Sequence, residues 1–573
     1  MPGGIQPPRQ GLRGALDRVL AAHLERVLPM AARPLYRAFE AATLDVAATQ
    51  RAVMLEILAY AAATEFGRGH GFAAIRTWDE FRRALPVRDF EDFRPWMERH
   101  QRGEQGVLFP GKPLMYNRSS GTTARPKLLP VTPHAFERTI RDRGKLWLYG
   151  MMRHFPGIYA GKDLTLVSPA VEGYTEDGTP FGALSGLVYR NIPGFMKALH
   201  SVPEDTILIR DYLTKLYTLL RFALGSNVSC IVTGNPATVV NLATRADAWR
   251  EELIRDIRDG TLRRDLPLEG GIRAQCERLL RPDPGRAAEL ERLVEAHGRL
   301  RPAEYWPNLK LIHTWKHGNC RLVLPRLAPW FRPETPILDF GYIASEINAT
   351  DLVLPENDGS VLQVQNAFFE FSREEEGDSP RRRFFLAHEL EVGGRYFIHV
   401  TTFSGLYRYD MNDVLEVIGH FHQAPVLRFL YKGKGITSLQ GEKLSEAQLI
   451  EAMARAERAS GLSFGFFVAW ADPEASRYDL YVEFPFASDV RHHTAFAAAV
   501  DRALAEVNVE YEAKRSSGRL NPPRVLPLVR DAFERYRELR LEEGAYSGQL
   551  KWLHLSGTEA DRKRMERLRA PEG

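Results

Sequence analysis

One stretch of hydroxyl side chains has the composition of an anion-binding loop. Residues 119–127 read Ser-Ser-Gly-Thr-Thr-Ala-Arg-Pro-Lys, so four hydroxyls and a glycine precede a cation. Ser and Thr compete for backbone hydrogen bonds and Gly costs conformational entropy, so the stretch does not suit a helix interior. Backbone amides and hydroxyls of such a loop can surround phosphate oxygens, with the Lys127 charge beside them. A polar surface turn has a similar composition, and the stretch alone leaves both interpretations open.

Two carboxylates further along the chain, Glu346 and Asp413, each end a distinctive segment. Glu346 ends the segment Gly-Tyr-Ile-Ala-Ser-Glu, which follows a short expected strand. Asp413 ends the run 401–413, which is rich in aromatic and basic residues. Each also has an ordinary structural explanation when taken alone. Glu346 could form a salt bridge at a strand end, Asp413 could be a turn residue, and Lys551 could be a surface lysine.

The elements around these residues alternate between strand and helix. Short apolar runs at 164–168, 229–236 and 309–315 predict buried strands, and helical patterns lie between them. This alternation predicts an α/β domain with a substantially parallel sheet, in which ligands bind beyond the strand ends. We expect the hydroxyl-rich loop just ahead of a long helix over 134–155, whose N-terminus favours anions.

A second domain is expected after a short glycine-containing hinge. Residues 432–435 read Lys-Gly-Lys-Gly, and the pattern changes beyond them. Ser445 and Gln448 form a capping box at the start of a helix, and the alternation over 478–484 predicts a half-exposed strand. The charged tail 559–573 is expected to be mobile. We therefore expect a disordered tail over 1–10, a large domain over 11–431, the hinge, and a compact α+β domain over 436–573.

Composition excludes several classes of partner. The 77 basic and 73 acidic residues give a net charge of only +4, which argues against a nucleic acid or an anionic membrane. No apolar run is long enough to span a bilayer. The three cysteines are scattered and odd in number, which is typical of a reducing compartment. His420 with His422, and His492 with His493, lack a nearby third ligand, so a zinc site is not expected. We expect a cytoplasmic monomer that acts on small molecules.

The ordered series of motifs resembles a known family. Residues 119–127 resemble the phosphate loop of the adenylate-forming superfamily. The segments 341–346, 366–371 and 401–413 are similar, in this order, to the Gretchen Hagen family. These are the auxin-responsive acyl acid amido synthetases of plants and their bacterial relatives. The segments 441–446 and 544–551 extend the resemblance over about residues 30–555.

The resemblance implies a fold and a reaction. The fold is a large N-terminal adenylate-forming domain with mixed and parallel sheets and flanking helices, followed by a small mobile α+β lid. The reaction has two steps, and it uses ATP and Mg²⁺. A carboxylic acid attacks ATP to give an acyl-adenylate and pyrophosphate, and an amine, usually of an amino acid, then attacks the adenylate to form an amide.

The same resemblance implies roles for individual residues. Lys127, Lys551 and Glu346 would be catalytic, and Glu346 would hold Mg²⁺, which favours one or two carboxylates plus phosphate. Asp413 would bind the ribose hydroxyls, while Tyr342 and Ala344 would line the adenine pocket. The implied nucleotide site comprises Ser119, Ser120, Gly121, Thr122, Thr123, Tyr342, Ala344, Ser345, Asp413, Arg428 and Lys434. The acyl-acid pocket is expected to draw on 171–186, 233–236 and 315–319.

Some positions depart from the family pattern, and two rival functions stay open. Ala124 and Asn412 stand where glycine is usual, and Trp552 and Leu553 replace the Pro-Arg that often follows the C-terminal lysine. One rival is an enzyme that passes the acyl group to a thiol such as coenzyme A. The other is a relative that binds the nucleotide without turnover.

Overall fold

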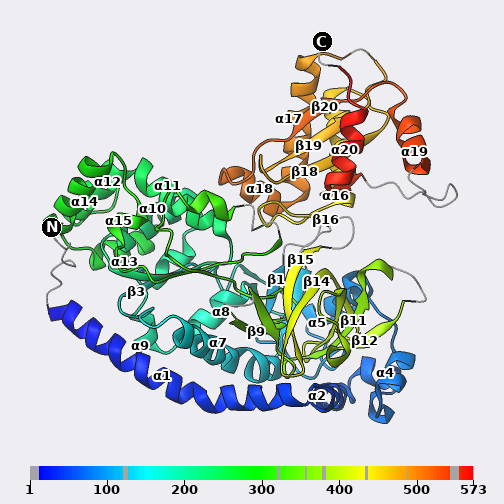
Figure 1. Cartoon of the computed structure of the whole chain (residues 1–573), viewed down its shortest axis with the longest axis horizontal. Coiled ribbons are helices and arrows are strands. Elements are labelled where there is room, and N and C mark those ends of the chain that lie inside the picture. Colours follow the sequence, from blue (N-terminus) through cyan, green and yellow to red (C-terminus); the bar gives the residue numbers. More distant parts are fainter. Residues whose placement is uncertain are drawn as a thin grey trace. The chain divides into compact units, whose positions relative to one another are not determined.

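The computed structural model describes residues 12–119, 127–318, 320, 323–354, 358–376, 382–432, 436–486, 488–542 and 554–571 (Figure 1). The chain divides into two compact units. One comprises Met1–Arg118 and Leu128–Tyr431, and the other comprises Ser119–Lys127 and Lys432–Gly573. Residues 433–435 of the expected hinge lie outside the described residues, so the hinge and a mobile lid stay predictions. The α/β class expected from the sequence is confirmed by the sheets described below.

A helical segment begins the larger unit. Its helices are α1 (Leu12–Leu44), α2 (Val46–Ala61), α3 (Glu65–Gly69), α4 (Trp78–Ala84) and α5 (Phe90–Gln101). Asp45 accepts a hydrogen bond from the amide of Ala48 and so caps α2. The buried Gln50 of α2 donates to the carbonyls of Val364 and Ala367 at 2.5 and 2.8 Å, which ties the helix to the antiparallel sheet described below.

A parallel sheet forms the first α/β layer. Its order is β3-β6-β7-β8, with bounds Lys162–Thr165, Val228–Val232, Leu311–His313 and Ile337–Leu338. Each neighbouring pair is parallel, for example with Ile231 opposite Ile312. The strands expected at 164–168, 229–236 and 309–315 are therefore confirmed. The helices of this region are α8 (Leu184–Arg190), α9 (Gly194–Lys197), α10 (Tyr212–Leu224), α11 (Pro236–Ala248), α12 (Arg250–Asp259), α13 (Gly270–Leu279), α14 (Pro284–His297) and α15 (Pro302–Tyr305).

A seven-stranded sheet forms the second layer, in the order β12-β11-β13-β14-β15-β10-β9. The strands are β9 (Thr350–Leu354), β10 (Gly359–Leu362), β11 (Phe368–Arg373), β12 (Phe384–Leu386), β13 (Arg395–Thr401), β14 (Tyr409–Phe421) and β15 (Ala424–Lys432). β11 pairs antiparallel with β12 and β13, and β13 pairs antiparallel with β14. Side chains of α2, α5 and this sheet share one hydrophobic core, which includes Ile57, Phe93 and Phe371.

The hydroxyl-rich loop connects two strands of a smaller sheet. β1 (Met115–Ser119) and β2 (Lys127–Val131) are neighbours in the order β2-β1-β5-β4, with β4 at Gly173–Tyr174 and β5 at Pro180–Gly182. We had expected the loop directly ahead of a helix. This expectation is wrong, because the apolar run 128–131 forms β2 first. Thr132 then caps α6 (Pro133–Ala135), and a π-helical turn (Phe136–Ile140) leads into α7 (Arg141–His154).

The smaller unit is a four-stranded sheet with helices on both faces. The sheet order is β20-β19-β18-β21, with bounds Arg524–Pro527, Arg477–Val482, Phe467–Asp472 and Leu555–Ser556. β16 (Ile436–Thr437) pairs with β17 (Leu444–Ser445) ahead of it. The helices are α16 (Glu446–Ser460), α17 (Val490–Val507), α18 (Val509–Ser516), α19 (Ala532–Glu542) and α20 (Glu559–Arg567). The capping box of Ser445 and Gln448 is confirmed.

Two expectations for this unit are wrong. The strand over 478–484 is not half-exposed, because α19 and α20 cover its second face, where Tyr481 is buried. The tail 559–573 is not a free charged segment. Residues Glu559–Arg567 form α20, and Met565 of this helix and the following Leu568 are buried against β18 and β19.

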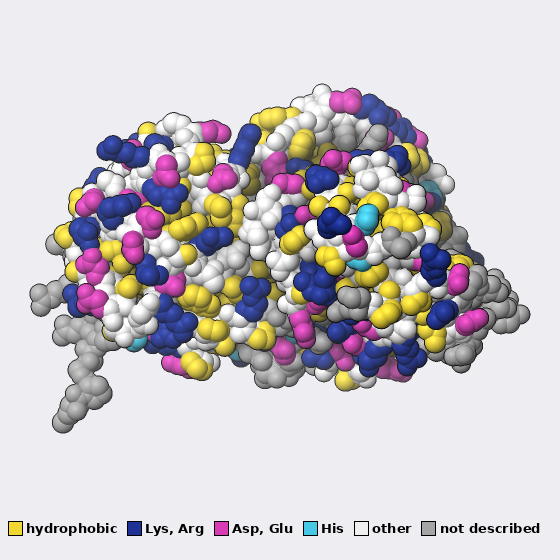
Figure 2. Space-filling model, turned by 90° about the horizontal axis from the view of Figure 1, so that it is seen from above, with side chains coloured by type: hydrophobic (Ala, Val, Ile, Leu, Met, Phe, Trp, Pro, Cys, Tyr) yellow, Lys and Arg dark blue, Asp and Glu magenta, His cyan; other side chains and the backbone are white. Residues whose placement is uncertain are grey.

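The surface agrees with the balanced composition. Figure 2 shows acidic and basic side chains interspersed over the face that it presents. In the described part of the chain, every helix is too short or too polar to cross a bilayer.

Candidate active site

A tight turn after β8 carries the first group of predicted site residues. Gly341 has a φ of +76°, and a Cβ there would lie 2.7 Å from Oγ1 of Thr350 and 2.9 Å from Oγ of Ser360. Only glycine fits this conformation and this space. The amide of Tyr342 donates to Oγ1 of Thr350 at 2.7 Å, and the amide of Gly341 donates to Oδ2 of Asp339 at 2.7 Å. Side chains on both sides of the turn therefore fix its path.

β14 carries the second group. Asp413 is a buried strand residue, so the alternative that it belongs to a turn is wrong. Asn412 before it has a φ of +54°, a left-handed conformation that glycine and asparagine tolerate best. Its amide donates to Oδ1 of Asp410 at 2.9 Å. This explains why Asn412 can stand where the resembling family has glycine.

The two groups contact each other through crossed hydrogen bonds. The hydroxyl of Tyr342 donates to Oδ2 of Asp413 at 2.6 Å, and the hydroxyl of Tyr409 lies 3.3 Å from Oε1 of Glu346. Each tyrosine precedes the carboxylate on its own element by four residues. Burial, with the nearby carboxylate charges, raises the pKa of both phenols well above its ordinary value, so both are neutral donors. The structure thus brings Asp413 next to Tyr342 and Glu346, although the sequence places Asp413 in a separate motif.

An aromatic ring pair lies beside the turn. The rings of Tyr342 and Phe429 are nearly parallel, at 9°, with centroids 6.0 Å apart. Gly318 has a φ of +59°, and a Cβ there would lie 2.7 Å from Cε1 of Phe429. Ala344 packs against the hydrophobic core that α2, α5 and the seven-stranded sheet share. The carbonyl of Ser345 accepts a hydrogen bond from Nδ2 of Asn117 at 3.0 Å. Sequence reasoning missed Phe429, which directly follows the predicted Arg428.

Asn117 links the turn to the strand that precedes the hydroxyl-rich loop. Its Nδ2 donates to Ser345, and its Oδ1 accepts from the amide of Leu184 at 3.0 Å. Asn117 lies on β1 and its side chain is buried. Its place two residues before Ser119 is the signal that could have identified it.

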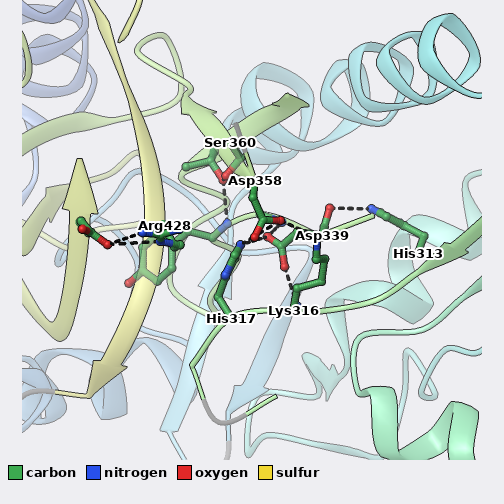
Figure 3. Close-up of polar contacts among 11 residues, drawn as sticks. His313, Lys316, His317, Asp339, Asp358, Ser360 and Arg428 are labelled. Atoms are coloured by element: carbon green, nitrogen blue, oxygen red, sulfur yellow. Dashed lines mark hydrogen bonds and ion pairs between the residues drawn. The ribbon is translucent and has the colours of Figure 1, made fainter. Parts of the chain in front are cut away.

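A charged cluster that the sequence did not indicate surrounds Asp339, which accepts the amide of Gly341 (Figure 3). Nζ of Lys316 lies 2.5 Å from Oδ1 of Asp358, and Nε2 of His317 lies 4.0 Å from Asp339 and 3.9 Å from Asp358. The amide of Lys316 donates to Oδ1 of Asp339 at 2.7 Å. Burial raises the pKa of the Asp339 carboxyl. Asp339 accepts amides from the segments that follow β7 and β8, so it holds these two segments together.

Arg428 is held within the antiparallel sheet. It lies on β15 and pairs with Glu416 of β14, with 2.8 Å between Nη2 and Oε2 (Figure 3). A contact of this guanidinium with a nucleotide stays a prediction.

Aromatic rings gather at the carboxyl edge of the parallel sheet. His313 stacks on Phe340 with ring centroids 4.0 Å apart, and Trp147 lies 4.9 Å from His313. Trp315 lies 6.0 Å from Phe340 and is 36% exposed. Its amide donates to the carbonyl of Gly234 at 2.9 Å. His313 ends β7, and Trp315 and Phe340 come two residues after β7 and β8, at the edge where ligands of parallel sheets bind.

The remaining predicted residues have no described side-chain environment or lie outside this geometry. Ser119 ends β1, and Lys127 opens β2 and is half-buried. Several residues named in the sequence analysis lie outside the described parts of the chain: Ser120, Gly121, Thr122, Thr123, Ala124, Lys434 and Lys551. Their roles stay predictions.

Three family models match consecutive parts of the chain. The GH3 family N-terminal domain matches residues 35–337, the central domain matches 360–432, and the C-terminal domain matches 447–560. The chain belongs to the GH3 family. This confirms the resemblance to the Gretchen Hagen family that the motif series indicated.

Plant GH3 proteins are similar over most of the chain. An indole-3-acetic acid-amido synthetase of Arabidopsis thaliana, GH3.17, is 26% identical, covering 75% of this chain and 76% of that protein. A 4-substituted benzoates-glutamate ligase of the same plant, GH3.12, is 23% identical, covering 82% and 86%. The jasmonoyl–L-amino acid synthetase GH3.5 of Oryza sativa subsp. japonica is 25% identical, covering 90% and 93%.

Solved structures of this family share the fold. The GH3.15 acyl acid amido synthetase gives a TM-score of 0.63 at 23% identity, covering 94% of this chain and 96% of that chain. The same enzyme in complex with 2,4-DB gives 0.65 at 22% identity, covering 95% and 97%.

Proposed function

We propose that this GH3 chain activates a carboxylic acid with ATP and conjugates it to an amine, most simply the α-amino group of an amino acid. The observation that carries this proposal is the crossed pair of hydrogen bonds, which links Asp413 of β14 to the turn that carries Glu346 in a chain of this family. The amido synthetase and ligase activities named for its relatives support the same reaction.

The first step forms the acyl-adenylate. A carboxylate oxygen of the acid attacks the α-phosphorus of ATP, the bond between the α- and β-phosphates breaks, and pyrophosphate leaves. Asp413 accepts hydrogen bonds from the ribose hydroxyls, a role that suits a buried carboxylate. Lys127 and Lys551 supply positive charge to the phosphates. The hydroxyl-rich loop donates to their oxygens.

Glu346 offers a ligand for the Mg²⁺ that the reaction needs. Among the residues that the structure describes, no cluster of three or more His, Cys, Asp or Glu side chains could hold a metal. A single carboxylate fits Mg²⁺ nonetheless, because this ion takes one or two carboxylates together with phosphate oxygens and water. When bound, Mg²⁺ neutralises phosphate charge. Glu346 is half-buried and directed by Tyr409, which suits a carboxylate that orients an ion.

In the second step the amine nitrogen attacks the acyl carbon. The bond from this carbon to the adenylate oxygen breaks, AMP leaves with the electron pair, and the nitrogen loses a proton. We propose that the rings of Trp147, His313, Trp315 and Phe340 line the pocket for the acid. Their carbon surfaces favour an acid with a ring or another bulky apolar group.

Acid-dependent exchange of pyrophosphate into ATP tests the first step. We expect wild-type exchange with at least one acid of a panel that includes indole-3-acetate, 4-substituted benzoates and jasmonate, and near loss of exchange in Glu346→Gln. Product analysis then separates an amide from a thioester. Nucleotide binding without exchange for any acid would favour the non-catalytic alternative. Cytoplasmic location and a monomeric state stay predictions.

A further inference from the structure

The turn after β8 and strand β14 exchange two tyrosine–carboxylate hydrogen bonds in opposite directions. Tyr342 of the turn donates to Asp413 of the strand, and Tyr409 of the strand bonds to Glu346 of the turn. We propose that both tyrosines are positioning residues, with Tyr409 directing Glu346 toward Mg²⁺ and Tyr342 directing Asp413 toward the ribose. This inference rests on the proposed function, because it uses the roles proposed for the two carboxylates.

A neutral phenol is a suitable partner for such a carboxylate. It donates one hydrogen bond and adds no charge, so it fixes one oxygen without competing with the cation or the ribose for the other. Partners of this kind orient the ligand of a metal and tune its affinity. The phenols bond to Oε1 of Glu346 and Oδ2 of Asp413, and each bond restricts the rotation of its carboxylate group.

A buried ion pair fixes the backbone that presents Tyr409. Arg408 has a φ of +50°, which is uncommon outside glycine. Its Nε lies 2.8 Å from Oε2 of Glu370, and its Nη1 donates to the carbonyl of Leu85 at 2.7 Å. Nε1 of Trp78 donates to the other oxygen of Glu370 at 2.9 Å. Both partners of the ion pair are almost fully buried, so the strained residue before Tyr409 is held from several elements.

The other side of Tyr409 is also fixed. The amide of Asp410 donates to the carbonyl of Arg88 at 2.8 Å, and the amide of Arg88 donates to the carbonyl of Arg408 at 3.1 Å. Arg88 thus forms a bridge with the start of β14. The ring of Tyr409 also packs against Phe93, with centroids 6.3 Å apart. Because the backbone and ring of Tyr409 are held in place, its hydroxyl can orient the Glu346 carboxylate.

Tyr407 provides a matched control on the same segment. It is as buried as Tyr409, and its hydroxyl donates to the carbonyl of Leu108 at 2.5 Å. Tyr407→Phe removes a buried hydrogen bond of comparable cost but leaves both carboxylates bonded. Any effect that Tyr409→Phe shares with Tyr407→Phe is therefore structural.

The experiment measures metal and nucleotide dependence separately. In pyrophosphate exchange we expect Tyr409→Phe to raise the Mg²⁺ concentration for half-maximal rate roughly tenfold, in line with other partners of metal ligands. We expect the KM for ATP at saturating Mg²⁺ to change less than about twofold. Tyr342→Phe should do the reverse, raising the KM for ATP roughly tenfold as a charge-assisted bond is lost. A second measurement uses electron paramagnetic resonance to follow the binding of Mn²⁺ to the full chain with nucleotide. The affinity for Mn²⁺ should fall in Tyr409→Phe and stay unchanged in Tyr342→Phe and Tyr407→Phe.

The outcomes separate this inference from the proposed function. Equal Mg²⁺ dependence in wild type, Tyr409→Phe and Tyr407→Phe would overturn the positioning role of Tyr409. Equal KM values for ATP in wild type and Tyr342→Phe would overturn that of Tyr342. If the wild type exchanges pyrophosphate with no acid, the proposed function fails, and Mn²⁺ and nucleotide binding still test both tyrosines.

Discussion

The hydroxyl of Tyr342 donates to Oδ2 of Asp413 across 2.6 Å, and this bond connects the turn after β8 with strand β14. Both side chains are buried. The residues are 71 positions apart in the chain, so the bond forms only in the folded protein. Asp413 is therefore oriented by the protein itself.

Replacement of Asp413 tests its place in the nucleotide site. Asp413→Asn keeps an oxygen that can accept from Tyr342 but loses the charge and one acceptor. Hydrogen bonds to charged groups contribute about 1.5–3 kcal/mol, so we expect the KM for ATP to rise about ten- to hundredfold. Pyrophosphate exchange at varied ATP measures this. Asp45→Asn serves as control, because it removes a carboxylate that caps α2 and asparagine caps as well. If the KM for ATP is unchanged in Asp413→Asn, Asp413 does not bind the nucleotide.

The left-handed conformation of Asn412 predicts which substitutions the start of β14 tolerates. We expect Asn412→Gly to fold with stability near that of the wild type, because glycine adopts a φ of +54° without strain. Asn412→Val should lower the free energy of unfolding by about 1–3 kcal/mol, since a β-branched residue is strained there. Thermal unfolding of the two variants measures the difference. Equal melting temperatures would show that the backbone can leave this conformation without cost.

His100 predicts an acid-sensitive contribution to stability. It is buried, stacks on Phe109 with centroids 3.9 Å apart, and accepts a hydrogen bond from the amide of Leu108 through Nε2 at 3.0 Å. Burial lowers its pKa from 6.5 to about 4. Since the pKa in the folded chain is below that of the unfolded chain, the contribution is complete above pH 6.5. It is lost as the pH falls toward 4, and it amounts to about 3 kcal/mol.

The variant His100→Gln isolates this contribution from other titrating groups. Glutamine can accept from the amide of Leu108 and does not titrate. The wild type should lose more stability than the variant between pH 7 and pH 4, and the two should run parallel above pH 7. Denaturation by urea at a series of pH values gives both curves. Parallel curves throughout would show that His100 does not gain its proton in this range.

The packing of α20 predicts that the C-terminal tail contributes to the fold. Met565 is fully buried between this helix and the sheet of the smaller unit. Met565→Ala should reduce the stability of this packing by about 2–5 kcal/mol. Faster hydrogen exchange over 555–568 and 466–482 would report the loss. Lys563→Ala, on the exposed side of the same helix, should leave exchange unchanged. Fast hydrogen exchange over 559–567 in the wild type would contradict this packing and support a mobile tail.

The sequence predicts elements well where one local pattern determines them. The apolar runs at 229–236 and 309–315 form β6 and β7, and the spacing of Ser445 and Gln448 marks the start of α16. It fails where a distant element supplies the partner. The alternation over 478–484 implied an exposed face, because nothing local shows that α20 covers it. Met565 and Leu568 are the apolar positions of a strongly charged segment, too few for a clear periodicity.

The candidate site divides in the same way. The motif series identified Tyr342, Glu346 and Asp413, and the structure brings them together. The cluster of Lys316, His317, Asp339 and Asp358 had no signal, because Lys316 and Asp358 are 42 residues apart and pair only in the folded chain. The ring pair of Tyr342 and Phe429 depends likewise on the meeting of a turn and a strand.

Gly234 offers a test of the acyl-acid pocket that leaves the nucleotide site intact. A Cβ on Gly234 would lie 2.7 Å from Cζ3 of Trp315 and 3.1 Å from Cε3 and Cη2, so Gly234→Ala must displace the indole. If Trp315 lines the pocket, the KM for the preferred acid should change about tenfold, the scale on which a pocket discriminates one or two methylene groups. The KM for ATP should change less than about twofold. Gly270→Ala is the control, because a Cβ there meets no atom within 4 Å. Equal acid preference in wild type, Gly234→Ala and Gly270→Ala would place the acid elsewhere, away from the carboxyl edge of the parallel sheet.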